Sequence, residues 1–545
     1  MLLIDWYTPV KAITERLVTI NSVSPGSGEI VLADAIISIL QEDNLANSYQ
    51  LCETVPITHD RYQRTNAIAY LPGVRPEVLI LLGHFDTVGI TDYGSLESLA
   101  TQPSLLSEHW AELMDGTPLD DPENWWFGRG AVDMKSGVAI NIAIMRYFAQ
   151  RQRDHGEPPP LSLLLLATPD EETESVGAMA GITWLAEQRR QRQLRYVGLI
   201  NTDYISPRFP GDTERPIYSG TVGKLLPLFY VVGKAAHVGE PYAGIDANLL
   251  CAELVRDLCM NPALTDHVGD ERTAPPVTLH QSDLKTTYNV QTPFAAWFYL
   301  NILTMTTTPA EALARLCTIS QAALDRVLQR LVNQFSQQAM GQNVPQHLLN
   351  ANVFTFADLY AATCERVGIE VAAKLIIEPQ ITEGDSRTAT LRVIERLWQH
   401  SGQHGPAAVI AFAPPYYPHI PEHDTPFLQA IRAVAERHQP EGIVLRQFFP
   451  CLSDLSYMQI DPELDVTVMT ANMPLWTDGI PQLEQWGYSV PFTAIEAAAI
   501  EGIANIGVYG QGAHQRDERV YMPYSFRVAP QLVYEAILEV AARMK

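Results

Sequence analysis

The chain has 545 residues, 62 of them acidic and 37 basic, and its formal net charge is −25. This length exceeds the ~250–300 residues at which one hydrophobic core stops growing, so at least two domains are expected. The acidic balance argues against nucleic acid or an anionic membrane as the main partner, because binding to phosphate needs a basic face.

The sequence also lacks the usual features of membrane and secreted proteins. No window approaches the ~20 apolar residues that a membrane-spanning helix needs, and Asp5 stands where a signal peptide carries basic residues. The six cysteines are scattered and include no CxxC pair, which argues against a disulfide framework. We therefore expect a soluble protein of the reducing cytoplasm.

The first 205 residues alternate helical patterns with short apolar runs. The predicted helices are Lys11–Ile20, Glu29–Gln41 and Gly137–Gln150. The predicted strands are Ala67–Leu71, Val78–Leu82, Leu161–Leu166 and Val197–Ile200. Buried strands separated by helices predict an α/β sheet with parallel strands. In such sheets ligands bind beyond the carboxyl ends of the strands, so the residues just after each apolar run are the candidates for chemistry.

Two proline-rich stretches, Pro207–Pro216 and Pro414–Pro421, mark candidate domain boundaries. In the segment between them, helices are predicted at Ala247–Met260, Pro309–Gln338 and Phe354–Ala373, and a strand pair is predicted around Thr286–Thr307. The last segment returns to the α/β pattern, with helices at Thr425–Arg437 and Ala529–Arg543. We therefore predict an outer domain in two parts, residues 1–213 and 419–545, and an inserted domain of residues 214–418.

Four apolar runs lead into side chains that bind divalent metals. The residues that follow them are His84 and Asp86, then Glu171 and Glu172, then Asp203, and finally His514 after a glycine loop. Asp133 lies between them in chain order, in a glycine-flanked loop before a helix. Imidazoles and carboxylates are ligands that zinc or a similar divalent ion prefers. Each residue alone could be structural, so the prediction depends on the whole set, with Asp133 as the carboxylate that bridges two ions.

Five sequence motifs occur in a fixed order, namely GHFDTV, GRGAVDMKSG, ATPDEETESVGA, NTD and GAHQRDE. They resemble the successive signatures of the di-zinc aminoacylase/carboxypeptidase superfamily, which includes acetylornithine deacetylase, succinyl-diaminopimelate desuccinylase, peptidase T and carboxypeptidase G. The resemblance runs from about Ser22 to Glu518, and FPCLSDLSY and NIGVYGQGAHQRDERVY are most similar to the arginine-utilisation branch. It implies a discontinuous α/β catalytic domain with a mostly parallel sheet, and an inserted α+β lid and dimerisation domain enlarged by extra helices.

The resemblance also implies a role for each motif residue. His84 and Asp203 would be the terminal ligands of one ion, Glu172 and His514 those of the other, and Asp133 would bridge both. Asp86 would accept a hydrogen bond from the His84 imidazole and fix its tautomer. Glu171 would be the general base for a water activated by two divalent ions, with zinc expected first and manganese or cobalt as alternatives.

The inserted domain carries a second resemblance. His237, at the end of GKAAH, and Asn289, in TTYNVQTP, resemble lid residues of the family, where the histidine binds the substrate carbonyl or the tetrahedral intermediate. Lid strands of the family commonly carry an arginine that binds a substrate carboxylate, but residues 296–301 read AWFYLN and contain none. Arg387, in GDSR, is a candidate substitute, and a solvated surface arginine is the alternative.

These features together predict a di-zinc metallopeptidase or amidohydrolase that cleaves a small peptide or an N-acyl amino acid. The resemblance suggests a substrate derived from arginine or ornithine. We expect a homodimer formed through the lid, with a monomer as the alternative, and neither nucleic acid nor membrane as a partner. The competing hypothesis is a non-catalytic binding or assembly module on the same fold.

Overall fold

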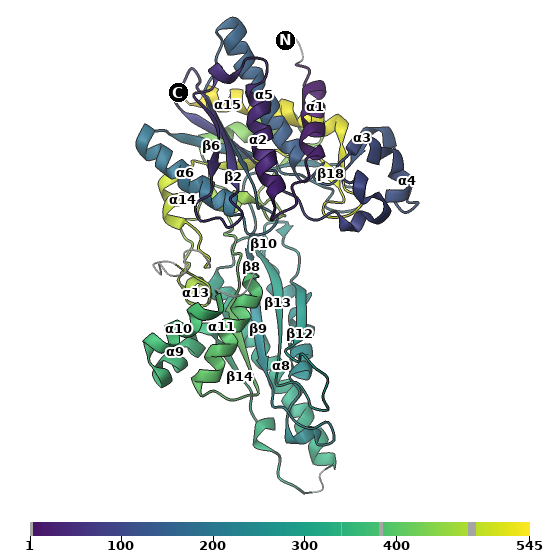
Figure 1. Ribbon diagram of the computed structural model, residues 1–545, viewed down its shortest axis with the longest axis vertical. Coiled ribbons are helices and arrows are strands. Elements are labelled where there is room, and N and C mark those ends of the chain that lie inside the picture. Colours follow the sequence, from purple (N-terminus) through teal and green to yellow (C-terminus); the bar gives the residue numbers. More distant parts are fainter. Residues whose placement is uncertain (1–3, 339–340, 381–384, 478–486, 545) are drawn as a thin grey trace. The chain divides into compact units, whose positions relative to one another are not determined.

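The computed structural model describes residues 4–338, 341–380, 385–477 and 487–544 (Figure 1). The chain divides into two compact units. Met1–Thr221, Ile420–Ile460 and Pro491–Lys545 form the first unit, and Val222–His419 and Asp461–Val490 form the second. The predicted boundaries after residues 213 and 418 lie near two of these borders. The predicted outer segment 419–545 differs from this division at Asp461–Val490, where Leu475 packs in the apolar core of the second unit.

An eight-stranded sheet forms the centre of the first unit, in the order β1-β2-β5-β3-β6-β17-β7-β16. Its strands are β1 (Leu51–Pro56), β2 (Thr65–Leu71), β3 (Val78–His84), β5 (Ser162–Thr168), β6 (Tyr196–Asn201), β7 (Arg215–Tyr218), β16 (Ile443–Arg446) and β17 (Ile503–Asn505). The central strands β5, β3, β6 and β17 are parallel, and β1 and β2 add antiparallel pairs at one side. Every residue of β3 is buried, as expected for a parallel strand covered on both faces. The predicted α/β class is confirmed.

Helices cover both faces of this sheet (Figure 1). One group shares a continuous apolar core with the strands and consists of α1 (Tyr7–Thr19), α2 (Ser27–Gln41), α5 (Lys135–His155), α12 (Pro426–Arg437) and α15 (Ala529–Arg543). On the opposite face, α6 (Val176–Arg192) packs through Gly181 against Leu166, with α14 (Phe492–Ala498) beside it. The smaller elements are α3 (Pro103–Leu106), α4 (Trp110–Leu113), and a sheet of β18 (Gly510–Gln511), β19 (Arg519–Tyr521) and β4 (Trp125–Phe127).

The second unit is built on a six-stranded sheet in the order β12-β13-β9-β15-β14, with β8 paired to β13. Its strands are β8 (Gly223–Leu225), β9 (Pro227–Val232), β12 (Val277–Asp283), β13 (Ala295–Thr304), β14 (Asn352–Thr355) and β15 (Ala407–Phe412), and β10 (His267–Val268) pairs with β11 (Glu271–Arg272). Its helices are α7 (Ala247–Leu258), α8 (Pro309–Gln338), α9 (Phe356–Val367), α10 (Ile369–Gln380), α11 (Ser386–Ser401) and α13 (Thr467–Ala471).

Two predicted elements of the second unit need correction. The helix predicted over Phe354–Ala373 is two helices, because Gly368 has a φ of 85° and ends α9. The strand pair predicted around Thr286–Thr307 is β12 with β13, so its first strand lies before the predicted range. Helix α8 coincides with its predicted range.

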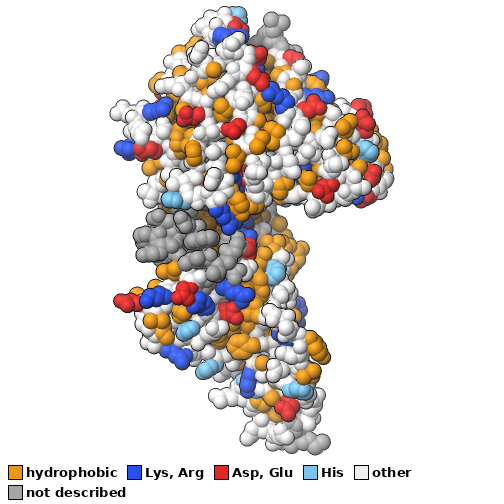
Figure 2. All heavy atoms as spheres, in the orientation of Figure 1, with side chains coloured by type: hydrophobic (Ala, Val, Ile, Leu, Met, Phe, Trp, Pro, Cys, Tyr) orange, Lys and Arg blue, Asp and Glu red, His pale blue; other side chains and the backbone are white. Residues whose placement is uncertain are grey.

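The structure also bears on membrane crossing and on surface charge. Within the described ranges, no helix combines the length and the apolar composition needed to cross a membrane. On the face drawn in Figure 2, basic side chains are interspersed with acidic ones.

Asp266 secures the end of β13 and gives a stability prediction. Its Oδ2 accepts hydrogen bonds from the backbone N–H groups of Met305, Thr306 and Thr307 at 2.9, 2.8 and 2.7 Å. Burial alone would raise the pKa of this carboxyl, but the three hydrogen bonds outweigh it and lower the pKa to about 2. Asp266→Asn is expected to lower the free energy of unfolding by about 2–3 kcal/mol at pH 7, because bonds to a charged acceptor are lost.

The pH dependence of this effect has a definite sign. Because the pKa of Asp266 falls from 3.8 to about 2 on folding, its stabilisation is present above pH 3.8 and is lost as the pH falls towards 2. Urea unfolding at pH 7 and at low pH should therefore show a large difference between wild type and Asp266→Asn at neutral pH and a smaller one in acid. Equal stability of the two proteins at pH 7 would contradict this account.

Candidate metal centre

Adjacent strand ends bring most of the predicted ligands together. His84 ends β3 and pairs with Thr168, the last residue of β5, so the loop that carries Glu171 and Glu172 begins beside it. Asp203 follows β6, the parallel strand on the other side of β3. The predicted convergence at the carboxyl edge of the sheet is therefore present.

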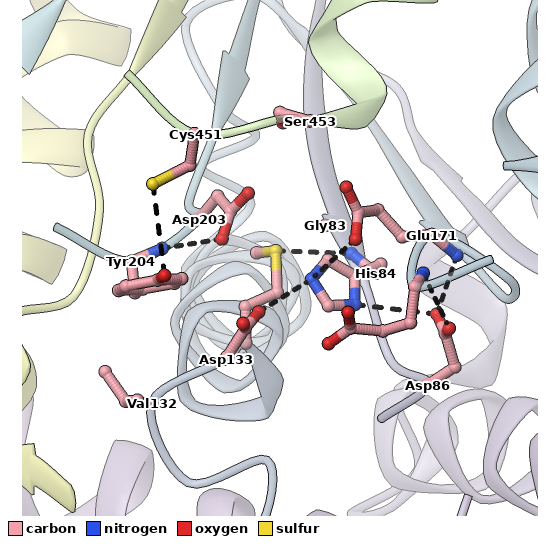
Figure 3. A network of polar contacts seen from close by, with 12 residues as sticks. Gly83, His84, Asp86, Val132, Asp133, Glu171, Asp203, Tyr204, Cys451 and Ser453 are labelled. Carbon is pink, nitrogen blue, oxygen red and sulfur yellow. Dashed lines mark hydrogen bonds and ion pairs between the residues drawn. The ribbon is translucent and has the colours of Figure 1, made fainter. Parts of the chain in front are cut away.

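Asp133 lies between two imidazoles. Its Oδ1 is 3.0 Å from Nε2 of His84, and its Oδ2 is 3.1 Å from Nε2 of His514. The same His514 nitrogen is 3.0 Å from a carboxylate oxygen of Glu172. Ligand atoms of His84, Asp133 and Asp203 lie within 4.8 Å of one another, and so do those of Asp133, Glu172 and His514. The same holds for His84, Glu171 and Glu172. Asp133 is thus common to two groups of metal-binding side chains, the first of which is drawn in Figure 3.

The backbone at two of these loops is unusual. His514 has a φ of 64° and Asp170, next to Glu171, has a φ of 72°. Few residues other than glycine adopt this left-handed conformation, and it is enriched at functional sites. Asp170 is held in place by a buried ion pair with Arg64.

Burial determines the charge of the site. Burial, reinforced by the charge of Asp133, raises the pKa of Asp203 to about 8, and burial also raises the pKa of Glu172. Hydrogen bonds with Asp133 and Glu172 raise the pKa of His514 to about 11. Crowded carboxylates with little access to water are costly unless cations compensate them. Two imidazoles, several carboxylates and one shared carboxylate therefore fit a pair of divalent cations.

Glu171 lies beside this group and can exchange a proton with a reactant. Its Oε2 is 3.9 Å from Nε2 of His84, and its side chain is only 9% exposed. Burial raises the pKa of Glu171 well above its usual range, opposed by the nearby His84. In Figure 3 its carboxylate is directed to the same space as those of Asp133 and Asp203.

Asp86 contacts the backbone of the Glu171–Glu172 loop as well as the predicted imidazole of His84. Its two carboxylate oxygens accept hydrogen bonds from the backbone N–H groups of Glu171 and Glu172, at 3.0 and 3.1 Å (Figure 3). Nδ1 of His84 is 3.5 Å from Asp86, longer than a well-formed hydrogen bond, and has no hydrogen-bond partner among the described residues. Asp86 therefore fixes the Glu171–Glu172 loop more firmly than it fixes the imidazole.

The predicted catalytic residue His237 and the predicted substrate-binding residues Asn289 and Arg387 are in the second unit. His237 and Asn289 lie on paired segments, since Val238 N donates to Val290 O at 3.0 Å. The Asn289 side chain accepts a hydrogen bond from the backbone N–H of Gln291 at 3.1 Å. Arg387 forms an ion pair with Asp385 at the start of α11. The structure thus brings His237 and Asn289 close together and places Arg387 on a separate helix.

Two residues without a predicted role, Asn505 and Gly507, hold Asp203 in place. Nδ2 of Asn505 donates to the Asp203 carbonyl at 2.9 Å. A Cβ atom at Gly507 would lie 1.7 Å from the same carbonyl oxygen. The only signal for these residues in the sequence is the glycine-rich stretch after the Ile503 run, which carries no information about its partner.

Gly507→Ala is expected to displace Asp203 and to lower metal content, because the clash is with backbone that cannot rotate away. Metal analysis of the purified variant after dialysis checks this expectation. Gly156→Ala, just after the C-terminal end of α5, is the control, since a Cβ atom there meets nothing within 4 Å and the change acts only through the positive φ of 69°. Wild-type metal content in Gly507→Ala would contradict it.

Comparisons with known proteins identify relatives of this chain. The family model described as Peptidase family M20/M25/M40 matches residues 81–539. Protein RocB of Bacillus subtilis (strain 168) is 32% identical over 551 residues, covering 96% of this chain and 94% of RocB. Succinyl-diaminopimelate desuccinylase of Xylella fastidiosa (strain M12) is 30% identical over 165 residues, 30% of this chain and 37% of that enzyme. The crystal structure of aminopeptidase PepT from Bacillus cereus ATCC 10987 has a TM-score of 0.52 at 12% identity and covers 98% of both chains.

Proposed function

Because this chain belongs to peptidase family M20/M25/M40, we propose that it is a metal-dependent hydrolase that cleaves an amide bond of a small peptide or an N-acyl amino acid. The family predicted from the five motifs is thereby confirmed. The observation that carries the proposed activity is the position of Asp133, whose two oxygens face the imidazoles of His84 and His514 at 3.0 and 3.1 Å.

The proposed centre takes two divalent ions. His84, Asp133 and Asp203 would hold one ion, and Asp133, Glu172 and His514 the other. The mixed imidazole and carboxylate set suits zinc, with manganese or cobalt as alternatives. Such ions, when bound, lower the pKa of a water and polarise the carbonyl of an amide.

The residues of this chain would then handle the proton. Oε2 of Glu171 accepts the proton of the attacking water and returns it to the nitrogen of the leaving amine. Asp86 keeps Glu171 in position through the backbone, so the Glu171 carboxylate stays free for proton transfer. The low exposure of Glu171 keeps bulk water from taking the proton between the two steps.

The proposed substrate is cationic and derived from arginine or ornithine. The resemblance to the arginine-utilisation branch supports this class, and the net charge of −25 favours a positively charged ligand in general terms. His237 and Asn289 are proposed to bind the scissile amide group. Arg387 is proposed to bind a substrate carboxylate in place of the arginine missing from the lid strand.

Metal analysis combined with a substrate screen tests this function. The screen contains the N-acetyl and N-succinyl derivatives of arginine, ornithine and leucine and the corresponding dipeptides. Each compound is tested in the presence of Zn²⁺, Mn²⁺ or Co²⁺. We expect about two bound ions per chain and faster hydrolysis of the arginine or ornithine compounds than of the leucine compounds. A protein without bound metal and without hydrolysis would instead be a binding or assembly module.

Two further proposals concern assembly and location. We propose a homodimer formed through the second unit, because β12 is an edge strand on which Leu279 is 54% exposed. Light scattering coupled to gel filtration should give a mass twice that of one chain. A measured mass equal to that of one chain would favour the monomer.

A cytoplasmic location is also proposed, and it is supported by the six free cysteines of the chain.

A further inference from the structure

The side chain of Glu518 binds the backbone of the Asp133 loop. Its side chain is 1% exposed, and its Oε1 accepts hydrogen bonds from the backbone N–H groups of Val132 and Asp133 at 3.3 and 3.4 Å. The backbone carbonyl of Glu518 accepts a further hydrogen bond from Gly128 N at 3.1 Å. Glu518 also belongs to the segment that carries His514. It therefore connects the loop of the shared carboxylate to the segment of one imidazole.

Arg129 connects the same loop to a third segment. Its guanidinium is 2% exposed and donates to Glu518 at 2.7 Å, to Asp92 at 2.8 Å and to the Gly89 carbonyl at 3.0 Å. A longer contact of 3.4 Å reaches the carbonyl of Gln515. Gly89 and Asp92 follow His84 in the chain, and Gln515 follows His514. One side chain thus contacts the segments after both imidazoles.

We propose that Arg129 and Glu518 are positioning residues of the metal centre. They hold the Asp133 loop in a fixed position relative to the segments that carry His84 and His514. This inference rests on the proposed two-metal function. Glu518 reaches Asp133 through its backbone N–H and leaves the carboxylate oxygens to the imidazoles. The pair therefore acts through Asp133.

A purely stabilising role explains these contacts less well. A buried ion pair is a weak source of stability, because removing two charges from water costs about as much as their attraction returns. Apolar side chains of similar volume would fill the space but could not bind the N–H groups of the Asp133 loop. A bridging carboxylate needs accurate placement, and outer partners of metal ligands change metal affinity by ~10–100-fold when they are replaced.

Zinc affinity measured by chelator competition tests the pair. Glu518→Gln keeps the shape and an acceptor oxygen but loses the charge, and it is expected to weaken zinc binding by ~10–100-fold. The visible absorption of the cobalt-substituted variant should also change, since the ligand geometry around the ion changes. Asp92→Asn is a milder second variant, because the Asp92 side chain is 39% exposed, and it should shift zinc affinity in the same direction.

Asp212→Asn provides the matched control. Asp212 pairs with Arg208 at 2.8 Å within the same unit, and its side chain is 2% exposed. It belongs to none of the metal-binding groups of the described residues. Its replacement removes a comparable ion pair and should leave zinc affinity and the cobalt spectrum unchanged.

The outcomes separate this inference from the proposed function. Wild-type protein that binds no metal would overturn both. Wild-type protein that binds two ions, with unchanged zinc affinity in folded Glu518→Gln and Asp92→Asn, would overturn only the positioning role. An equal loss of affinity in Asp212→Asn would overturn it as well. If Glu518→Gln does not fold, as judged by circular dichroism, Asp92→Asn decides alone.

Discussion

Glu171→Gln is expected to lower kcat by ~10²–10⁴-fold while both metal ions stay bound. Glutamine has nearly the same shape as glutamate but cannot accept the proton of the attacking water. The contacts from Asp86 reach the backbone of Glu171, at 3.0 Å, so they are retained in the variant. Steady-state kinetics on the best substrate, with metal analysis of the same preparation, measure the two quantities together.

Glu174→Gln is the matched control for this variant, because Glu174 lies in the same loop and belongs to none of the groups of potential ligands among the described residues. It should keep wild-type kcat and metal content. A change in KM with kcat preserved in Glu171→Gln would indicate substrate binding instead of proton transfer. Near-wild-type kcat in fully metallated Glu171→Gln would remove Glu171 from the role of base.

The sequence is sufficient to predict the part of the site that strands position. His84 and Asp203 follow apolar runs, and parallel strands place their carboxyl ends at one edge of a sheet. The order of the motifs then adds Asp133, Glu172 and His514, which do lie together. The proximity of these side chains could be expected, because the strand ends follow from local pattern and the other residues follow from the family resemblance. Their roles as metal ligands stay a prediction.

The supporting contacts could not be predicted in the same way. Arg129 and Glu518 are separated by 389 positions, and their pairing depends on how two loops approach in the folded unit. The clash avoided at Gly507 depends on a carbonyl more than 300 residues away. Neither partner leaves a periodic pattern or a spacing that identifies the other.

The backbone contacts of Asp86 could not be predicted for a similar reason. Asp86 lies two positions after His84, and this spacing favours a contact with the imidazole. In the fold, the loop after β5 offers two backbone N–H groups to the same carboxylate at 3.0 and 3.1 Å. Two such bonds hold the carboxylate more effectively than one long contact of 3.5 Å to the ring. Backbone donors from a distant loop are invisible in a motif.

Asp133→Asn is expected to lose both ions, whereas His514→Ala should lose only one. Two unit charges ~4 Å apart interact by about 4 kcal/mol at an effective dielectric constant of ~20, and two dications by about four times as much. The Asp133 carboxylate offsets this repulsion for both ions, while His514 belongs to one group only. Metal content after dialysis should therefore fall well below one ion per chain in Asp133→Asn and to about one in His514→Ala.

The comparison between these two variants isolates the bridge from an ordinary ligand. Asparagine keeps one ligand oxygen but replaces the other with an amide nitrogen that has no lone pair for a metal ion, so it could serve only one of the two groups. Hydrolysis should fall at least as far as in Glu171→Gln, because the variant lacks metal as well as geometry. If Asp133→Asn retained two ions with wild-type affinity, Asp133 would not be the shared ligand, and the two groups of side chains would have to act independently.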